Sequence, residues 1–314
     1  MTMAANPQIF TFLGILTTAY FLRRLVSFIW LYYLRPSSVN KFIYGKEPYA
    51  LITGASDGIG RATALELYEK GFNLILHGRN EAKLTKVISE IKATAKGPSR
   101  DIKYFIASAD SPEVDFQKIA DEFRQLKVTL LINNVGGSNG LRSEKVDGYD
   151  ETELLCDIRI NALFPFYLTR AFLPQLRSTG GPVEVIFVGS QSADIAIPRL
   201  YTYAPSKAFL HRLACCLNSD EQFWTPSNVR FVYWNVGTVV TNSLRETPGL
   251  FYPLAAKFAK SAVARIGCGK ERVTPYAPHA FQQFFVGLLP ESFLLKYAAD
   301  TMKKLIEGFE KRVD

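Results

Sequence analysis

The sequence is poor in the residues that build metal centres and disulfides. Its 314 residues include three histidines, which lie far apart. The four cysteines are Cys156, Cys215, Cys216 and Cys268. None has metal-ligand spacing, and the adjacent pair suits a helix better than a disulfide. No Asn-x-Ser/Thr glycosylation acceptor occurs. These absences favour a reducing compartment, and the sequence predicts no metal site.

Acidic residues are missing from the front of the chain. None precedes Glu47, whereas residues 8–34 are apolar apart from Arg23-Arg24. Two arginines at the middle of a single span would be costly in the bilayer core. We therefore expect a membrane span over residues 4–22, with the arginine pair at its cytosolic end and residues 25–34 at the interface.

The basic excess of this segment places the rest of the chain on the cytosolic side. A cleaved signal peptide is the rival interpretation, but no small-x-small cleavage site follows the apolar run at the right distance. An amphipathic anchor in the membrane interface is a third alternative. We assign residues 1–35 to a membrane anchor and residues 36–48 to a linker.

The whole chain carries a formal charge of +8. This excess suits a membrane surface or an anionic substrate. No arginine-rich run or aromatic–basic stripe accompanies it, so the sequence does not favour a nucleic-acid partner. Apolar residues make up 48 % of the chain, which is enough for the core of one large domain behind the anchor.

Beyond the linker, short apolar runs alternate with helical stretches. The predicted strands are residues 49–53, 73–77, 102–107, 128–132, 183–188 and 229–234, and the predicted helices include residues 80–95, 151–176 and 203–218. This alternation predicts an α/β fold with a doubly wound, Rossmann-like parallel sheet and helices on both faces. Ligands of such sheets bind at the carboxyl ends of the strands. Residues 49–245 form the expected catalytic core, and residues 246–314 a helical region of the same domain.

A glycine-rich loop, Gly54-Ala-Ser-Asp-Gly58-Ile-Gly60, follows the first strand and precedes a helix. Glycines let the backbone approach a pyrophosphate, and the helix N-terminus offers N–H groups to the anion. The spacing differs from G-x-G-x-x-G, and an ordinary turn is the alternative. The position at the first strand–helix junction favours a dinucleotide site.

The end of the second strand indicates which dinucleotide binds. An NAD site carries Asp or Glu there for the ribose hydroxyls, but this chain has Gly78 followed by Arg79. The guanidinium can pair with a 2′-phosphate, so we predict NADP(H). Asp110, after the third strand, is a candidate for contact with the adenine, and a turn or N-cap role is the alternative. The amides of Asn133-Asn134 can tie neighbouring loops together.

The segment Tyr203-Ala-Pro-Ser-Lys207 places a phenol and an ammonium on one face of a helix. A fixed cation lowers the pKa of a phenol, which suits proton exchange with an alcohol or a ketone. Pro205 requires Tyr203 to lie in the first helical turn, near the positive end of the helix dipole. In a chain with 15 tyrosines, one such pair is expected by chance, so its meaning depends on the motifs around it.

Together these motifs resemble the short-chain dehydrogenases/reductases. The matching segments are Thr53-Gly-Ala-Ser-Asp-Gly-Ile-Gly60, Asn133-Asn-Val-Gly136, Asn161, Ser190, the Tyr203–Lys207 segment and Val236-Gly-Thr-Val-Val-Thr241. They stand in the family's order and span roughly residues 48–245. The sequence departs from the family in carrying Val236-Gly237 where Pro-Gly is common, and Val135 where alanine is usual.

The resemblance implies a seven-stranded parallel sheet and a Ser-Tyr-Lys-Asn catalytic set. Tyr203 would donate the proton in a reduction, and Ser190 would hydrogen-bond the carbonyl oxygen. Lys207 would hold the nicotinamide ribose and lower the pKa of Tyr203, while Asn161 would keep a water in the proton relay. The predicted cofactor contacts are Gly54, Ser56, Asp57, Gly58, Ile59, Gly60, Arg79, Asn80, Asp110, Asn133, Asn134, Tyr203, Lys207, Val236 and Thr238.

A narrower resemblance points to the membrane-anchored branch that contains very-long-chain 3-oxoacyl-CoA reductases and 17-beta-hydroxysteroid dehydrogenases. It rests on the apolar front, on Asn-Asn-Val-Gly and on the tail segments Ser261-Ala-Val-Ala-Arg-Ile-Gly267, Thr274-Pro-Tyr-Ala-Pro-His279 and Leu288-Leu-Pro290. It implies an endoplasmic reticulum enzyme with a bulky, lipid-like substrate. A long-chain 3-oxoacyl-CoA is the expected substrate, with a steroid or a ketone of a specialised route as alternatives. The sequence leaves open whether two copies of the chain form a homodimer.

The region after Thr241 is where we expect substrate contacts. Residues 242–260 are rich in apolar side chains and form an expected lid with a hinge at Pro248-Gly249, the alternative being that Phe251, Leu254 and Phe258 are core. Residues 280–299, interrupted by Pro290, predict an interfacial or packed helix pair in place of a second span. Lys311-Arg312 resembles a retrieval signal, and a solvated helix end explains it equally well.

A protein of another class, a membrane-bound nucleotide-binding scaffold without turnover, is the competing hypothesis. The complete set of Ser190, Tyr203, Lys207 and Asn161 argues against it, because a scaffold has no need of proton-transfer groups.

Overall fold

The computed structural model describes residues 7–137, 143–244 and 246–313, with side chains to residue 307. The chain divides into two compact units, Met1–Ser37 and Ser38–Asp314. In the first unit, helix α1 (Pro7–Ile29) continues into a π turn at Trp30–Leu34. The helix runs through Arg23-Arg24 without a break. Over Gln8–Leu34 it is long and apolar enough to cross a membrane by length and composition.

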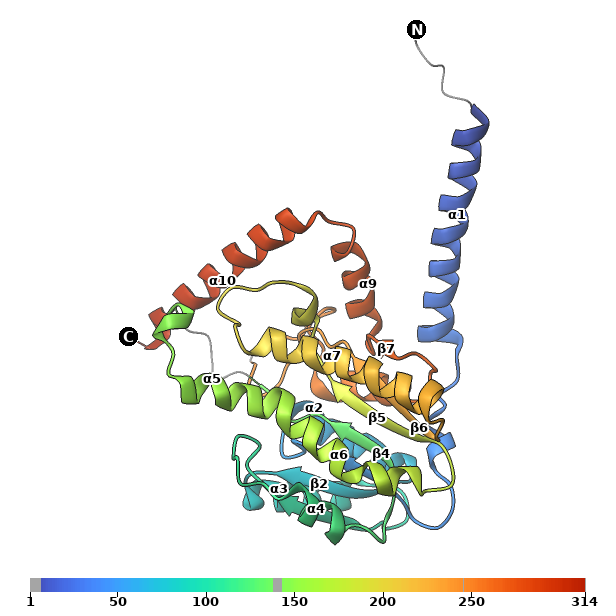
Figure 1. Ribbon diagram of the computed structural model, residues 1–314, viewed down its shortest axis with the longest axis vertical. Coiled ribbons are helices and arrows are strands. Elements are labelled where there is room, and N and C mark those ends of the chain that lie inside the picture. Colours follow the sequence, from blue (N-terminus) through green and yellow to red (C-terminus); the bar gives the residue numbers. More distant parts are fainter. Residues whose placement is uncertain (1–6, 138–142, 245, 314) are drawn as a thin grey trace. The chain divides into compact units, whose positions relative to one another are not determined.

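The second unit is built on seven parallel strands in the order β3-β2-β1-β4-β5-β6-β7 (Figure 1). The strands are β1 (Pro48–Ile52), β2 (Asn73–Gly78), β3 (Ile102–Ile106), β4 (Lys127–Asn133), β5 (Val183–Val188), β6 (Val229–Trp234) and β7 (Arg272–Val273). Five of these strands are buried along almost their whole length, which explains their continuous apolar runs. The predicted doubly wound parallel sheet is confirmed.

Helices cover both faces of the sheet. They are α2 (Gly58–Lys70), α3 (Glu81–Thr94), α4 (Phe116–Glu122), α5 (Glu151–Ile158), α6 (Phe164–Arg177), α7 (Tyr203–Ser219), α8 (Ala255–Val263), α9 (Ala277–Val286) and α10 (Glu291–Val313). Helices α4, α6 and α7 pack on one face, and in Figure 1 α6 and α7 lie in front of the sheet. Helix α2 packs on β1 and β2 and also against α3 and α8.

The core follows from this layering. On the α6–α7 side, strand residues such as Leu51, Leu131 and Phe187 pack against Phe172 and Leu210. Alternate strand residues face the other layer and are equally buried, as at Ile52. The sheet is therefore packed on both faces, and the predicted site residues follow the carboxyl ends of its strands.

Three segments differ from the sequence-based expectations. The compact unit begins at Ser38, and Val39 and Phe42 are buried, so much of the expected linker belongs to the body. The expected helix 151–176 is two helices joined by a π turn at Arg159–Leu163. Strand β7, only two residues long, was not expected from the sequence pattern.

The C-terminal region forms the expected helix pair, α9 and α10, with Pro290 between them. Of the three lid candidates, Phe258 is fully buried core on α8, whereas Leu254 is 53 % exposed. Lys311-Arg312 lies outside the described side chains.

Candidate active site

The sheet reverses its winding between β1 and β4, which are neighbours in space but not in sequence. Loops that leave the carboxyl ends of such a pair diverge, and the crevice between them is where α/β folds bind dinucleotides. Here those loops are the glycine-rich loop before α2 and the segment that follows Asn133. The predicted cofactor motifs therefore meet at the switch point.

Glycine is required within the loop by space and by backbone conformation. Gly54 and Gly58 have φ of 64° and 55°, in the left-handed region that other residues rarely adopt. A Cβ on Gly60 would overlap the Gly54 carbonyl and the Asn134 amide. The first turn of α2 consequently lies against the loop, and its N–H groups face the crevice.

A hydrogen-bond clamp joins the two loops. The Thr53 hydroxyl accepts from the backbone N–H groups of Asn134 and Val135, both at 2.9 Å. The Asn134 amide donates to the Thr53 and Gly54 carbonyls at 2.9 and 3.3 Å. The expectation that asparagine ties neighbouring loops together is confirmed for Asn134.

One histidine that no sequence motif marks contacts the glycine-rich loop. His77, 1 % exposed at the end of β2, accepts from the Gly54 N–H through Nδ1 at 3.4 Å and lies 3.0 Å from the Ala107 carbonyl through Nε2. Its ring stacks between Phe105 and Phe164. Burial lowers the pKa of His77 to about 4, so the ring is neutral at pH 7.

The residues expected to contact the adenosine half of the cofactor follow strands β2 and β3. Arg79 is exposed directly after β2. Ser56 lies next to Gly78, because a Cβ on that glycine would stand 3.5 Å from the serine Cβ. Asn80 caps α3 by accepting from the Lys83 N–H at 2.9 Å. Asp110 accepts from the Ser108 hydroxyl after β3. Cofactor contacts from these residues stay predictions.

Two predicted contacts have side chains engaged within the protein. The Asp57 carboxylate accepts from the Gly58 N–H at 2.7 Å and from the Asn242 amide at 2.9 and 3.1 Å. The buried Asn133 amide donates to Thr169 of α6 at 3.0 Å. Cofactor contacts from these two residues and from Ile59 stay predictions.

The π turn between α5 and α6 carries Asn161. Its amide donates to the Gly137 and Asp157 carbonyls at 2.6 and 2.9 Å, and its oxygen accepts from the Gly137 N–H at 3.0 Å. Asn161 is fully buried. A π turn widens the helix by one residue and is frequent at functional sites. Here it brings the Asn161 side chain to the segment that follows β4.

Lys207 lies next to Asn161. A Cβ on Gly136 would stand 2.7 Å from the lysine Nζ and 2.9 Å from the asparagine Oδ1. Nζ donates to the Val188 carbonyl at 3.1 Å and lies 5.5 Å from the centre of the Tyr203 ring. Burial lowers the pKa of Lys207 to about 8.

Tyr203 is the first residue of α7, so Pro205 stands in the first turn as expected. Burial raises the pKa of its phenol, and a hydrogen bond with the Ser190 side chain opposes that shift. The expectation of a lowered Tyr203 pKa is wrong for this structure. Desolvation disfavours the phenolate more than the hydrogen bond favours it. The phenol is protonated at neutral pH and is able to donate a proton.

Ser190 follows β5 and begins the short 3₁₀ helix Gln191–Asp194. Its hydroxyl accepts from the Ser192 N–H at 3.1 Å and hydroxyl at 2.8 Å. The structure thus brings Ser190, Tyr203, Lys207 and Asn161 together, in a chain of contacts that reaches the glycine loop through Gly136 and Asn134.

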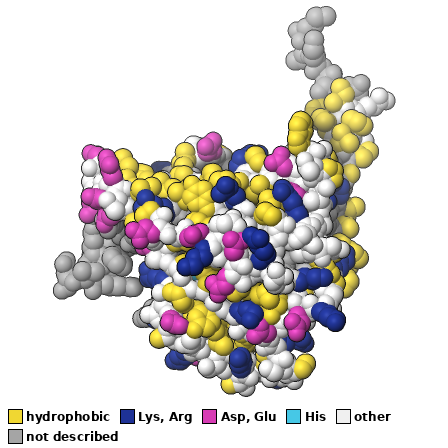
Figure 2. All heavy atoms as spheres, turned by 60° about the horizontal axis from the view of Figure 1, so that its bottom comes forward, with side chains coloured by type: hydrophobic (Ala, Val, Ile, Leu, Met, Phe, Trp, Pro, Cys, Tyr) yellow, Lys and Arg dark blue, Asp and Glu magenta, His cyan; other side chains and the backbone are white. Residues whose placement is uncertain are grey.

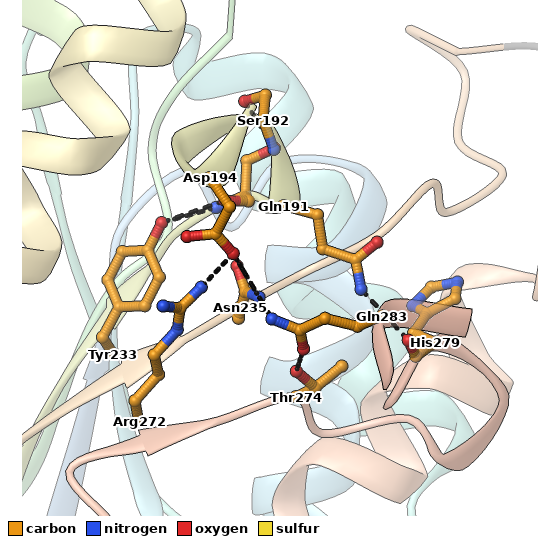
Figure 3. Close-up of polar contacts among 10 residues, drawn as sticks. Gln191, Ser192, Asp194, Tyr233, Asn235, Arg272, Thr274, His279 and Gln283 are labelled. Atoms are coloured by element: carbon orange, nitrogen blue, oxygen red, sulfur yellow. Dashed lines mark hydrogen bonds and ion pairs between the residues drawn. The ribbon is translucent and has the colours of Figure 1, made fainter. Parts of the chain in front are cut away.

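The segment after β6 lies beside the loop that carries Ser190. The Val236 carbonyl accepts from the Gln191 N–H at 2.9 Å, which fixes it beside the serine loop. Thr238 lies next to His279 of α9, whose Nε2 lies 2.9 Å from the Phe251 carbonyl. Figure 3 shows Gln191 and His279 facing one another across this junction.

The residues present fit a dinucleotide. Glycines line the loop where a Cβ would fill the space, the α2 N-terminus faces the crevice, and Lys207 stands between the loop and Tyr203. Such an arrangement can hold a nicotinamide cofactor beside a protonated phenol. Its chemistry is reduction of a carbonyl group or the reverse oxidation.

Comparisons with known proteins agree with this geometry. Very-long-chain 3-oxoacyl-CoA reductase of Kluyveromyces lactis is 35 % identical over 82 % of this chain and 75 % of its own. The protein of that name from Podospora anserina is 32 % identical over 87 % and 80 %. An alcohol dehydrogenase structure from Thermococcus sibiricus, complexed with 5-hydroxy-NADP, shares the fold with a TM-score of 0.61 at 23 % identity, over 73 % of this chain and 93 % of its own.

The model of the short chain dehydrogenase family matches residues 48–248, which include the glycine loop and all four predicted catalytic residues. The chain belongs to the short-chain dehydrogenase family.

Proposed function

We propose that this protein is an NADPH-dependent ketoreductase that converts the 3-oxo group of a long-chain 3-oxoacyl-CoA to a secondary alcohol. The observation that carries the proposal is the Tyr203 phenol beside Ser190 and buried Lys207 at a dinucleotide crevice. The substrate class comes from the relatives, which are named very-long-chain 3-oxoacyl-CoA reductases.

The residues divide the reaction between them. NADPH, when bound, supplies the hydride that the carbonyl carbon receives. Tyr203 donates its phenolic proton to the carbonyl oxygen, and the Ser190 hydroxyl donates a hydrogen bond to the same oxygen. Lys207, as a cation, stabilises the phenolate that remains, and Asn161 holds the backbone beside it. Arg79, exposed after β2, supports NADPH because it can pair with the 2′-phosphate.

The same proposal includes a membrane location. Helix α1 is long and apolar enough to span a bilayer, and the basic residues that follow support a cytosolic side for the catalytic body. The resemblance to very-long-chain reductases favours the endoplasmic reticulum. On the face drawn in Figure 2, basic and acidic side chains are interspersed, which supports a small-molecule rather than a nucleic-acid partner.

The test follows NADPH oxidation by the detergent-solubilised full-length protein. The panel contains short- and long-chain 3-oxoacyl-CoAs, a steroid ketone and a simple ketone. We expect turnover that increases with acyl length, and a loss of at least about 100-fold in kcat for Tyr203→Phe, the scale for removing a general acid.

Each other outcome has a definite meaning. Turnover only with the steroid or the simple ketone would replace the substrate class and leave the chemistry. Tight NADPH binding with no turnover of any carbonyl compound, in wild type and Tyr203→Phe alike, would establish the scaffold function in place of the enzyme.

A further inference from the structure

Tyr233, at the end of β6, is a fully buried tyrosine that the reaction above does not use. Its hydroxyl donates to the Ser190 carbonyl at 3.1 Å and accepts from the Ser190 N–H at 3.0 Å. Figure 3 shows the ring lying across from the start of the segment Gln191–Asp194, with its hydroxyl directed at that backbone. One side chain thus satisfies both backbone groups of the predicted catalytic serine.

The neighbouring glycine makes room for this ring. A Cβ on Gly189 would overlap the ring and hydroxyl of Tyr233. The Gly189 N–H donates to the Trp234 carbonyl at 2.8 Å, so the backbone before Ser190 is itself fixed to β6. Gly189 and Tyr233 therefore form a matched pair, in which the absent side chain of one is replaced by the ring of the other.

Two further contacts hold the ring in place. The Arg272 guanidinium lies 5.8 Å from its centre, and the His211 ring lies 4.9 Å away. Arg272 in turn pairs with Asp194, which accepts from Asn235 at 3.4 Å (Figure 3). Burial raises the pKa of Tyr233, so the phenol keeps the proton that it donates to Ser190.

The serine Oγ is attached through a single torsion with three staggered rotamers, so the backbone limits the oxygen to a few positions. We propose that Tyr233 is a positioning residue for Ser190, which fixes the backbone on both sides of the Cα and thereby aims the hydroxyl at the substrate carbonyl. This inference rests on the proposed function, in which Ser190 hydrogen-bonds that carbonyl. Displacement of a catalytic group by about 1 Å can cost about 100-fold in rate.

The decisive variant is Tyr233→Phe, which removes the hydroxyl and keeps the ring. The matched control is Tyr68→Phe on α2. Tyr68 is 3 % exposed, donates to the Arg100 carbonyl at 3.3 Å and accepts from the Arg100 N–H at 2.9 Å, away from the site. Each variant loses one hydrogen bond to a backbone carbonyl and one from a backbone N–H. We expect kcat to fall roughly 10-fold to 100-fold in Tyr233→Phe alone, with the KM for NADPH unchanged.

A double mutant separates positioning from a general loss of stability. If Tyr233 acts through Ser190, adding Tyr233→Phe to Ser190→Ala lowers kcat no further. Independent, additive losses would overturn the inference, and so would an unchanged kcat in Tyr233→Phe with a melting temperature lowered as in the Tyr68→Phe control.

Amide hydrogen exchange provides a measurement that needs no substrate. We expect the Ser190 amide to exchange faster in Tyr233→Phe, while peptides of α2 and β1 are unchanged. Unaltered protection would overturn the inference even if no substrate is turned over. Faster exchange together with full activity of Ser190→Ala would instead show that the proposed role of Ser190 is wrong.

Discussion

Arg79 and Lys207 are both basic, but they differ in burial and therefore in the groups that they can contact. Lys207 is 3 % exposed and burial lowers its pKa, so its charge responds to its immediate neighbours. Arg79 is exposed directly after β2. Only the exposed residue is free to meet a phosphate at the mouth of the crevice.

The exchange Arg79→Glu is expected to reverse the cofactor preference. The carboxylate repels a 2′-phosphate and accepts hydrogen bonds from ribose hydroxyls, so the KM for NADPH increases about 10-fold to 100-fold, while that for NADH changes little. Lys83→Glu, an equal charge change on the exposed side of α3, is the control. Steady-state kinetics with both cofactors measure the effect, and equal shifts for the two would refute the NADP(H) assignment.

Residues differ in how far the sequence predicts them. Tyr203 and Lys207 could be selected from their residue types and helical spacing, whereas Ser190 and Asn161 were predicted only through the resemblance to the family. Tyr233 could not, because a tyrosine at the end of an apolar strand has the pattern of core. Its role depends on the glycine at position 189, 44 positions earlier, which only the parallel pairing of β5 with β6 brings beside it.

At the scale of elements, the loop after β1 depends on the strand beside it. His77 joins β2 to Gly54 and to the segment after β3, so one imidazole links three neighbouring strands. The Gly54 contact requires an unprotonated Nδ1. Protonation of His77 at acidic pH would therefore break this contact between β2 and the glycine-rich loop.

The pH dependence of stability follows from this histidine. Its folded-state pKa is about 4, below the unfolded value of 6.5. The unfolded chain therefore binds more protons between these values, and stability falls as pH drops from 6.5 towards 4. At pH 5 the loss is about 2 kcal/mol, or roughly 4 °C in Tm. In His77→Gln we expect a smaller fall in Tm between pH 7 and pH 5.

Thermal melting of both proteins across that range measures the difference. His211 and His279 remain in both, and their lowered pKa values contribute equally. Parallel melting curves for wild type and variant would show that His77 is not the group responsible.

Element boundaries were predictable where local pattern decides them. Six strands could be predicted because buried parallel strands are continuous apolar runs. Strand β7 has two residues and leaves no such run. The π turn at Arg159–Leu163 has helical composition, and it shows only in the backbone, where the Phe164 N–H donates to the Arg159 carbonyl five residues earlier.

At the scale of the whole molecule, α1 is long and apolar enough to attach the protein to a membrane. Leu13 and Leu16 are 52 % and 50 % exposed, and they stand in the half of the helix that precedes Arg23-Arg24. A charge there would enter the bilayer core at a cost of about 3 kcal/mol each. Replacing both with Arg is expected to move the protein from the carbonate-resistant membrane pellet to the supernatant.

The control for this change lies within the same helix. Leu25→Arg adds a charge beside the existing arginine pair, where we expect the interface and therefore little effect. The opposite result would place the span in the second half of α1. In that case the Leu25→Arg protein would move to the supernatant, while the Leu13→Arg/Leu16→Arg protein would stay in the membrane pellet.

The hydrogen bonds between Asp57 and Asn242 have a consequence for biosynthesis. The two residues are 185 positions apart, so the glycine loop leaves the ribosome long before its last partner exists. At 5–20 residues per second this interval is about 10–40 s. During that interval the Asp57 carboxylate lacks the Asn242 amide from which it accepts hydrogen bonds in the folded protein. A chain that ended before Asn242 would therefore lack this connection between the glycine-rich loop and the segment after β6.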